Sequence, residues 1–401
     1  MTMARAWAEI DLAAVRHNAR LLRRIAAPAA LCAVVKANAY GHGAVPVARA
    51  ALQVGASWLA VATVEEGVEL RDAGITAPVL LLSEPPNEAM EDVLGGALTP
   101  TLCSFRGILS ADEAAARRGV VLDVHVKVDT GMHRIGADPG QLAAVVSAVT
   151  ASSHLRYGGL WTHMAVADGT REEDRAFTTT QLERFLALRH ELSKIGHVAP
   201  LVHAANSAAT IHYPESRLHL VRCGIALYGS QPSFADYRAT GMADEAAIGA
   251  TKGDSAPGPP ALHPVMSLRA KVSYVREVGA GERPSYGRMC PLDVPSFLAT
   301  VPIGYADGLP RQYFFGGGTV LVGGRRRRLA GAVTMDQIVV DCGPDATVSV
   351  GDDVVLIGSQ GNESITAWDW ARALNTIPNE VLSRIGPRVP RIVVDDNEDR
   401  R

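Results

Sequence analysis

The chain has 401 residues, of which 47% are hydrophobic and 20% are charged, and its formal net charge is −3 with a pI near 6.5. This length and composition are typical of a soluble globular protein with two or three domains. A nearly balanced charge gives no general electrostatic reason to bind nucleic acid or an anionic membrane. We therefore expect a small molecule as the partner.

Cysteine spacing and the N-terminus further restrict the class of protein. The five cysteines are widely spaced and include no C-x-x-C pair, so neither a disulfide framework nor a metal site is expected. The first residues lack a basic stretch followed by an apolar one, and no uncharged apolar run reaches membrane length. A cytoplasmic location is expected.

Short apolar runs alternate with stretches of helical period from about residue 30 to 230. The runs are residues 31–36, 58–62, 79–82, 98–103, 121–128, 158–163, 201–205 and 218–223, and helices are expected within 46–53, 65–73, 112–118, 141–148 and 177–195. Eight such units predict an N-terminal eight-stranded α/β barrel of the TIM type, although Pro100 weakens the fourth run.

The pattern changes after residue 230. Residues 234–262 resemble a long connection, and beyond them short strands are expected at 270–275, 298–301, 319–322 and 354–357, with one helix at 367–374. The run Arg325 to Arg328 follows two glycines and is expected to be a solvated hairpin tip. We thus predict a barrel at 9–233, a connection at 234–262 and a mostly-β C-terminal domain at 263–401.

Lys36 lies where the first apolar run ends, before a stretch of small residues that includes Gly41 and Gly43. A partly desolvated amine at the end of a buried strand has a lowered pKa and can form a Schiff base with a carbonyl. The glycines and the Tyr40 hydroxyl suit close approach by an anionic group such as a phosphate. A solvated surface lysine is the alternative.

Other reactive residue types also follow predicted strands, where barrel enzymes place their active sites. They are Lys127, Arg134, His163, Asn206, Ser207 and Arg222. Each has a structural alternative, since Asn206 could cap a helix, His163 could be a core residue and Arg222 a surface charge. Their shared position favours one site.

Seven segments, in the same order, resemble those of the pyridoxal-phosphate-dependent alanine racemases of fold type III. They are residues 33–43 (AVVKANAYGHG), 127–132 (KVDTGM), 203–207 (HAANS), 222–225 (RCGI), 285–287 (SYG), 302–308 (PIGYADG) and 335–337 (MDQ). The resemblance implies an isomerase of D-alanine biosynthesis that interconverts L- and D-alanine at Cα of a pyridoxal-phosphate aldimine. It also implies that residues 1–8 pair with the C-terminal domain.

The resemblance assigns two bases on opposite faces of the cofactor, Lys36, which also carries it, and Tyr286, which comes from the partner subunit. Proton removal from one face and delivery to the other requires such a pair. A homodimer with active sites shared between subunits is therefore implied, with Tyr305, Met335 and Asp336 of the partner lining the entrance and the substrate carboxylate pocket.

The remaining roles follow from the same resemblance. Arg222 would donate to the pyridine nitrogen and His163 would contact Arg222. Arg134 would bind the cofactor phenolic oxygen and the substrate carboxylate, held by Lys127, which is the position of a carbamylated lysine. Tyr40, Ser207 and the amides of Gly224 and Ile225 would hold the phosphate, with Asn206 nearby.

The chain departs from the family at Asn379, within residues 376–381 (TIPNEV), where a tyrosine is usual. Asparagine loses one phosphate contact, worth roughly 1–3 kcal/mol, and leaves room beside the substrate side chain. The hypothesis is that serine or another small amino acid is accepted in addition to alanine; the alternative is that the gap is filled and alanine is retained. Thr334, where cysteine is frequent, is a milder departure.

Two other functions compete with racemisation. A decarboxylase of basic amino acids shares the fold but pairs an acidic residue with the pyridine nitrogen, and Arg222 argues against it. A non-racemising homologue that only binds the cofactor is the second, and it would not need Tyr286 opposite Lys36.

Overall fold

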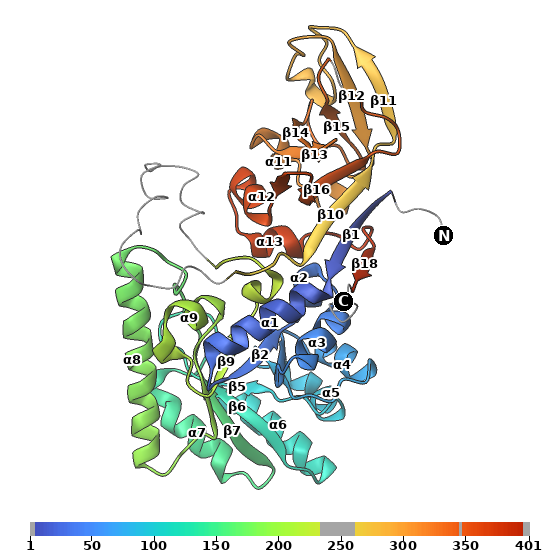
Figure 1. Ribbon diagram of the computed structural model, residues 1–401. Helices are drawn as coiled ribbons and strands as arrows, with labels where there is room; N and C mark the ends of the chain where they lie inside the picture. The colour runs from blue at the N-terminus through green and yellow to red at the C-terminus, as the bar shows by residue number, and fades with distance from the viewer. Residues whose placement is uncertain (1–4, 233–260, 345–346, 396–401) are drawn as a thin grey trace, which may run out of the picture.

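The computed structural model describes residues 5–232, 261–344 and 347–395, and it has two parts (Figure 1). The lower part in this view is a set of strands surrounded by helices, and the upper part is rich in strands. The predicted connection 234–262 lies outside the described residues except for its last two.

Eight parallel strands form the lower part. One sheet has the order β4 (Val79–Leu81), β3 (Trp58–Val61), β2 (Ala30–Val34) and β9 (Leu220–Cys223); the other has β5 (Thr101–Leu102), β6 (Leu122–Lys127), β7 (Leu155–Trp161) and β8 (Leu201–His203). Backbone hydrogen bonds connect the two sheets at both edges, from Thr99 to Val79 at 2.9 Å and from His219 to Val202 at 3.0 Å. The predicted eight-stranded α/β architecture is confirmed, and the fourth strand is short because it begins after Pro100.

Helices α1 (Leu12–Ala26), α3 (Ala44–Gln53), α4 (Val64–Asp72), α5 (Met90–Gly95), α6 (Phe105–Arg118), α7 (Leu142–Ala151), α8 (Glu172–Lys194) and α9 (Ser207–His212) accompany these strands. The sequence analysis did not predict α1, α5 or α9. The buried residues of α1 include Val15, Ala19 and Leu22, whose spacing of three to four places them on one face of the helix. Asp11 caps it by accepting from the Ala14 amide at 2.9 Å.

The segment α2 (Lys36–Gly41) follows β2 and is left-handed. Its four central residues, Ala37 to Tyr40, all have φ between 51° and 54°. Each non-glycine residue in this conformation costs about 1–2 kcal/mol, so the surrounding structure must hold the turn. Gly41 is required there because a Cβ would lie 2.5 Å from the Leu382 carbonyl oxygen.

The upper part contains two sheets. The larger has the order β14 (Arg325–Arg328), β13 (Thr319–Val322), β16 (Asp353–Gln360), β10 (Met266–Lys271), β1 (Ala6–Asp11) and β18 (Arg391–Val394), with β17 (Glu363–Ile365) paired to β16; the smaller has β11 (Tyr274–Val278), β12 (Ser296–Val301) and β15 (Ile338–Asp341). Strand β1 thus joins the N-terminus to the C-terminal sheet, antiparallel to β10 and parallel to β18. Helices α11 (Gln312–Phe315), α12 (Ala367–Leu374) and α13 (Pro378–Ser383) complete it.

Two sequence-based expectations for this part were wrong. The expected strand 270–275 is the end of β10 and the start of β11, with residues 272–273 between them. The arginine run is not a hairpin tip but the returning edge strand β14, because the turn lies at Gly323 and Gly324. Arg326 pairs with Glu363 at 3.6 Å and Arg328 with Asp341 at 3.0 Å. Charged side chains of this kind protect an exposed edge from pairing with another chain.

Candidate active site

A cavity of about 460 Å³ lies at the carboxyl ends of the barrel strands. Eleven residues selected from the sequence line it: Lys36, Tyr40, Lys127, Arg134, His163, Asn206, Ser207, Arg222, Gly224, Ile225 and Asn379. They come from segments more than 300 residues apart in the chain, which the barrel and α13 bring together. Tyr286, Tyr305, Met335 and Asp336 do not line this cavity.

Lys36 begins the left-handed turn immediately after β2. Burial lowers the pKa of its amine and the Arg134 guanidinium lowers it further, while Glu66 opposes the shift. Glu66 accepts hydrogen bonds from the amides of Ala37 at 2.6 Å and Ala62 at 2.7 Å. A carboxylate missed by the sequence analysis therefore fixes the backbone beside the lysine.

Arg222, at the end of β9, is buried in the floor of the cavity. Its Nη2 donates to the carbonyl oxygens of Thr162 at 2.7 Å and Ala204 at 3.0 Å, and lies 3.5 Å from Nδ1 of His163. Burial lowers the pKa of Arg222 to about 10, so the guanidinium remains protonated at neutral pH. Its Nε is buried without a hydrogen-bond partner among the described residues and can donate to a ligand.

Trp161 supports two cations of the site. The Lys127 ammonium lies 4.4 Å and the Arg222 guanidinium 4.5 Å from its ring centre, which is within cation–π range. Burial lowers the pKa of Lys127 to about 8, with Arg222 and Arg134 adding to the shift. A substantial fraction of this amine is neutral near physiological pH and can act as a nucleophile.

The cavity also holds an unpaired cation and a perturbed carboxyl. In the part of the chain that the structure describes, no side chain pairs with the guanidinium of Arg134, so it can receive an anionic group. Burial, with a smaller contribution from Asp174, raises the pKa of Asp168 to about 6.

A further part of the cavity wall is formed by Tyr40, Ser207 and Gly224. A Cβ on Gly224 would lie 2.4 Å from the Tyr40 hydroxyl, so only glycine permits this approach. The Ser207 hydroxyl accepts from the Gly224 amide at 2.9 Å, and burial raises the pKa of Tyr40 to about 12, which keeps it a neutral donor. Asn206 caps α9 by accepting from Ala209 at 3.0 Å, as its structural alternative predicted, and also faces the cavity.

These residues fit pyridoxal phosphate. Lys36 offers a desolvated amine for its aldehyde, the unpartnered Nε of Arg222 a donor for a ring nitrogen, and the cradle at Gly224 the space and donors for a phosphate. The three features occur in one cavity, which matches one elongated ligand with three different groups.

Four predicted residues lie in the upper part. Tyr286 is 72% exposed, Met335 53% and Tyr305 45%, and Asp336 is also exposed. The carboxylate of Asp336 pairs with Arg388 at 2.7 Å. Within the described residues of their own chain, none of the four lines the cavity that contains Lys36.

The sequence analysis missed several cavity residues, among them Trp161, Asp168 and Trp368. Asp168 follows β7 in a strand-to-helix loop, so its position was a usable signal. Trp368 belongs to α12, and its indole donates to the Gln231 carbonyl at 3.2 Å. No local pattern indicates such a contact between distant segments.

Comparison with known proteins identifies the family. Residues 10–232 match the model of the alanine racemase N-terminal domain, and residues 265–393 match that of the C-terminal domain. An alanine racemase of Synechocystis sp. is 41% identical, covering 98% of this chain and 100% of that protein. One of Symbiobacterium thermophilum is 42% identical, covering 96% of both.

Solved structures agree with these matches. An alanine racemase from D-cycloserine-producing Streptomyces lavendulae superposes with a TM-score of 0.86 at 39% identity, covering 98% of each chain. That of Streptomyces coelicolor A3(2) gives a TM-score of 0.87 at 39% identity, covering 97% of this chain and 98% of the other. The chain belongs to the alanine racemase family.

Proposed function

We propose that this protein interconverts L- and D-alanine with pyridoxal phosphate, using Lys36 and the Tyr286 of a second copy as the two bases. The observation that carries the proposal is the conjunction of a desolvated Lys36 and a buried, unpartnered Arg222 Nε in one cavity. When bound, pyridoxal phosphate supplies an aldehyde that holds the substrate amine and a ring that accepts electron density as the Cα proton leaves.

Lys36 moves a proton on one face of the substrate Cα, because burial lowers the pKa of its amine and so favours the neutral form that can accept a proton. Arg222 stays protonated and holds the pyridine nitrogen by hydrogen bonding without giving up its proton, which moderates the electron sink. His163 is held neutral because burial and Arg222 lower its pKa well below the usual value.

The second base comes from another subunit. Tyr286 is exposed on the upper part of its own chain and does not reach the cavity. In a homodimer, the partner's Tyr286, Tyr305 and Met335 would cover the cavity. This arrangement supplies the base on the opposite face of the substrate and excludes water from the site. The proposed domains are a barrel at 9–233 and a C-terminal domain at 263–401.

Arg134 binds the substrate carboxylate with its planar guanidinium. We assign to Lys127 the role of holding it, after the neutral amine attacks carbon dioxide, forms the N–C bond of a carbamate and releases one proton. The resulting anion would lie among Arg134, Arg222 and the Trp161 ring, which makes this site favourable for it. A ¹³C NMR signal after equilibration with ¹³C-bicarbonate, absent in Lys127→Ala, is the expected result.

The proposed setting is D-alanine biosynthesis in the cytoplasm, with no role for nucleic acid. None of the helices in the described ranges has both the length and the apolar character needed to cross a membrane. The net charge of −3 gives no general electrostatic attraction to phosphate backbones.

The test is racemisation of L-alanine and L-serine in parallel by the purified, cofactor-loaded protein, following D-product by chiral chromatography. Alanine turnover that disappears in Lys36→Ala supports the proposal. Equal turnover by that variant, or none by the native protein, contradicts it. Mixing Lys36→Ala with Tyr286→Phe subunits tests the shared site, because a mixed dimer regains one intact site only if the tyrosine acts across the interface.

A further inference from the structure

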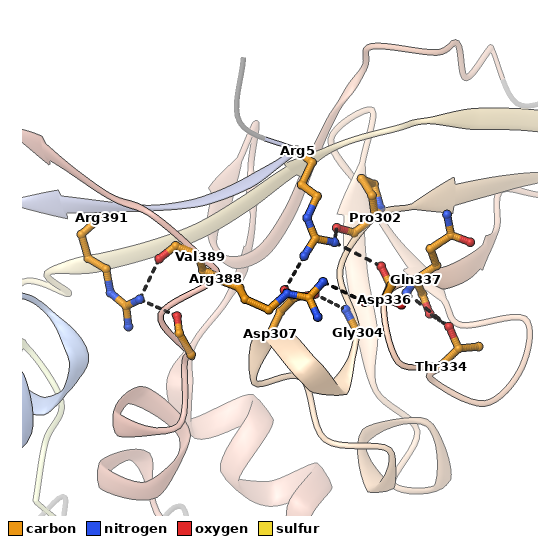
Figure 2. A network of polar contacts seen from close by, with 11 residues as sticks. Arg5, Pro302, Gly304, Asp307, Thr334, Asp336, Gln337, Arg388, Val389 and Arg391 are labelled. Atoms are coloured by element: carbon orange, nitrogen blue, oxygen red, sulfur yellow. Dashed lines mark hydrogen bonds and ion pairs between the residues drawn. The ribbon is translucent and has the colours of Figure 1, made fainter. Parts of the chain in front are cut away.

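Residues 385–391, here named the C-terminal strap, lead from α13 into the first residue of β18, and their two arginines form bonds in different directions (Figure 2). Arg391 donates from Nη1 to the carbonyl oxygens of Gly386 at 2.6 Å and Val389 at 2.7 Å, and from Nη2 to that of Ile385 at 2.5 Å. Its Nε donates to the carbonyl of Gly41 at 2.8 Å. Arg391 thus folds the strap upon itself and attaches it to the barrel.

The Gly41 contact matters because Gly41 ends the left-handed turn that starts at Lys36. That turn has an unfavourable backbone conformation and requires support from outside. Helix α13 lies directly against it, since a Cβ on Gly41 would meet the Leu382 carbonyl. Arg391 is therefore placed to hold the backbone that carries Lys36 and Tyr40.

Arg388 points to the other side of the strap. Its Nε lies 3.2 Å from Asp307 Oδ1 and its Nη2 lies 2.7 Å from Asp336 Oδ1. The carboxylate of Asp307 is 0% exposed and also accepts from Arg5 at 2.6 Å and from the Gly304 amide at 2.9 Å. Removing one of the cationic partners of a buried carboxylate costs much more free energy than breaking an exposed ion pair does.

Asp307 and Asp336 belong to the two loops that present Tyr305 and Met335. The loops are bonded to each other, because the Tyr305 amide donates to the Thr334 carbonyl and the Ala306 amide to the Met335 carbonyl, both at 3.0 Å. Arg5 adds a bond to the Pro302 carbonyl at 2.8 Å (Figure 2). The carboxylate of Asp336, which the resemblance assigns to the partner's substrate pocket, is paired with Arg388 of its own chain.

We infer that the C-terminal strap positions loops of two different active sites: Arg391 holds the cofactor turn of its own barrel, and Arg388, with Asp307 and Arg5, holds the Tyr305 and Met335 loops that cover the partner's cavity. The inference deepens the proposed function and rests on its shared sites. Arg388, Asp307 and Arg391 are positioning residues, since none of them lines the cavity.

Substitution of the two arginines should change two different constants. Arg391→Gln should raise the Kd for pyridoxal phosphate about tenfold, measured from absorbance during cofactor titration, and leave the KM for alanine unchanged at saturating cofactor. Arg388→Gln should raise the KM for alanine about tenfold with kcat and cofactor Kd unchanged within about twofold. Arg388→Lys, which keeps a charge near Asp307, should recover part of the loss.

Arg326→Gln is the matched control, because Arg326 is an arginine of the same sheet as Arg391 and its bonds go to Thr319, Glu363 and Ser364, away from both loops. Melting temperature and dimer mass are measured for every variant. If Arg391→Gln fails to fold, Arg391→Lys takes its place in the cofactor titration. Equal changes in both constants, or changes in melting temperature alone, would leave the strap a purely structural feature and overturn the inference.

Mixed dimers give the sharpest test. When one subunit carries Lys36→Ala, the single working site uses the barrel of the other subunit and the loops of the Lys36→Ala subunit. Placing Arg388→Gln on the Lys36→Ala subunit should raise the KM, whereas placing it on the subunit with the working barrel should not. Arg391→Gln should show the reverse dependence in cofactor affinity.

A failure of this inference differs from a failure of the proposed function. Tyr305→Ala and Met335→Ala test the shared site directly. If neither changes the KM for alanine, the assignment of these loops to the partner's cavity is wrong. If they raise it while Arg388→Gln does not, the shared site stands and the strap inference alone is wrong.

Discussion

Nη1 of Arg222 lies 2.8 Å from Nδ1 of His203 in the buried floor of the site. Because a guanidinium only donates, Nδ1 must be the acceptor, and the ring proton of His203 is placed on Nε2. That nitrogen lies 3.0 Å from Nδ1 of His125. Burial and Arg222 lower the pKa of His203 well below its usual value, and burial lowers that of His125 to about 4. Three residues thus form one directed chain that orients Arg222.

His203→Leu removes the acceptor of a buried charged group. We expect the free energy of unfolding to fall by about 1–3 kcal/mol, since the Nη1 donor of Arg222 is left without its partner. His203→Gln, whose amide oxygen can accept, should lose less. Denaturant titration of both variants measures the difference, and equal losses would show that the hydrogen bond to Arg222 is not what His203 contributes.

Asp168 should make stability depend on pH. Its pKa of about 6 in the folded protein exceeds the usual 3.8, so folding disfavours the charged form. The penalty is absent below the unfolded pKa, grows as the pH rises between the two values and is complete above about 6. Asp168→Asn should therefore raise the melting temperature by about 1–3 °C at pH 8 and by less at pH 5.

Calorimetry at the two pH values provides an internal control for this variant. A gain that is the same at pH 5 and pH 8 would mean that the substitution acts through packing and not through the charge of Asp168.

The sequence predicted the parts of the fold that depend on local periodicity. The alternation of short apolar runs and helical stretches places each barrel strand within a few residues, and the helix expected at 367–374 coincides with α12. Lys36 was identified because a reactive residue type followed a buried run. These signals are contained within segments of ten to twenty residues.

Features that depend on distant contacts could not be predicted in this way. The left-handed turn at Ala37 to Tyr40 has no residue-type signal apart from Asn38, since alanine and tyrosine disfavour that conformation. The pairing of Asp336 with Arg388 joins two residues that are 52 positions apart in the chain. Asp336 resembles a substrate-binding residue in sequence, and only the fold shows that its carboxylate also pairs with Arg388.

Gly224 should tolerate no side chain. Gly224→Ala places a Cβ 2.4 Å from the Tyr40 hydroxyl oxygen, so Tyr40 must move and this part of the cavity is distorted. We expect the Kd for pyridoxal phosphate to rise about tenfold or more, as measured by cofactor titration. Gly279→Ala is the control, because nothing lies within 4 Å of its Cβ. Unchanged cofactor affinity in Gly224→Ala would show that Tyr40 does not hold the phosphate.

Asn379 lines the cavity beside Pro378 at the start of α13, so its size affects the room available to the substrate. Asn379→Tyr should narrow this end and lower kcat/KM for serine relative to alanine by about tenfold, because a smaller pocket excludes the larger side chain by crowding.

Asn379→Leu separates the two effects of the tyrosine, since leucine adds volume without a phenol. If volume decides, both variants should lower the serine-to-alanine ratio. If the phenol matters by contacting the phosphate, only Asn379→Tyr should also tighten cofactor binding, by about 1–3 kcal/mol at most. A ratio that stays constant in both variants would mean that other side chains around the cavity already exclude serine, or admit it, regardless of residue 379. Steady-state rates with both substrates and a cofactor titration decide between these outcomes.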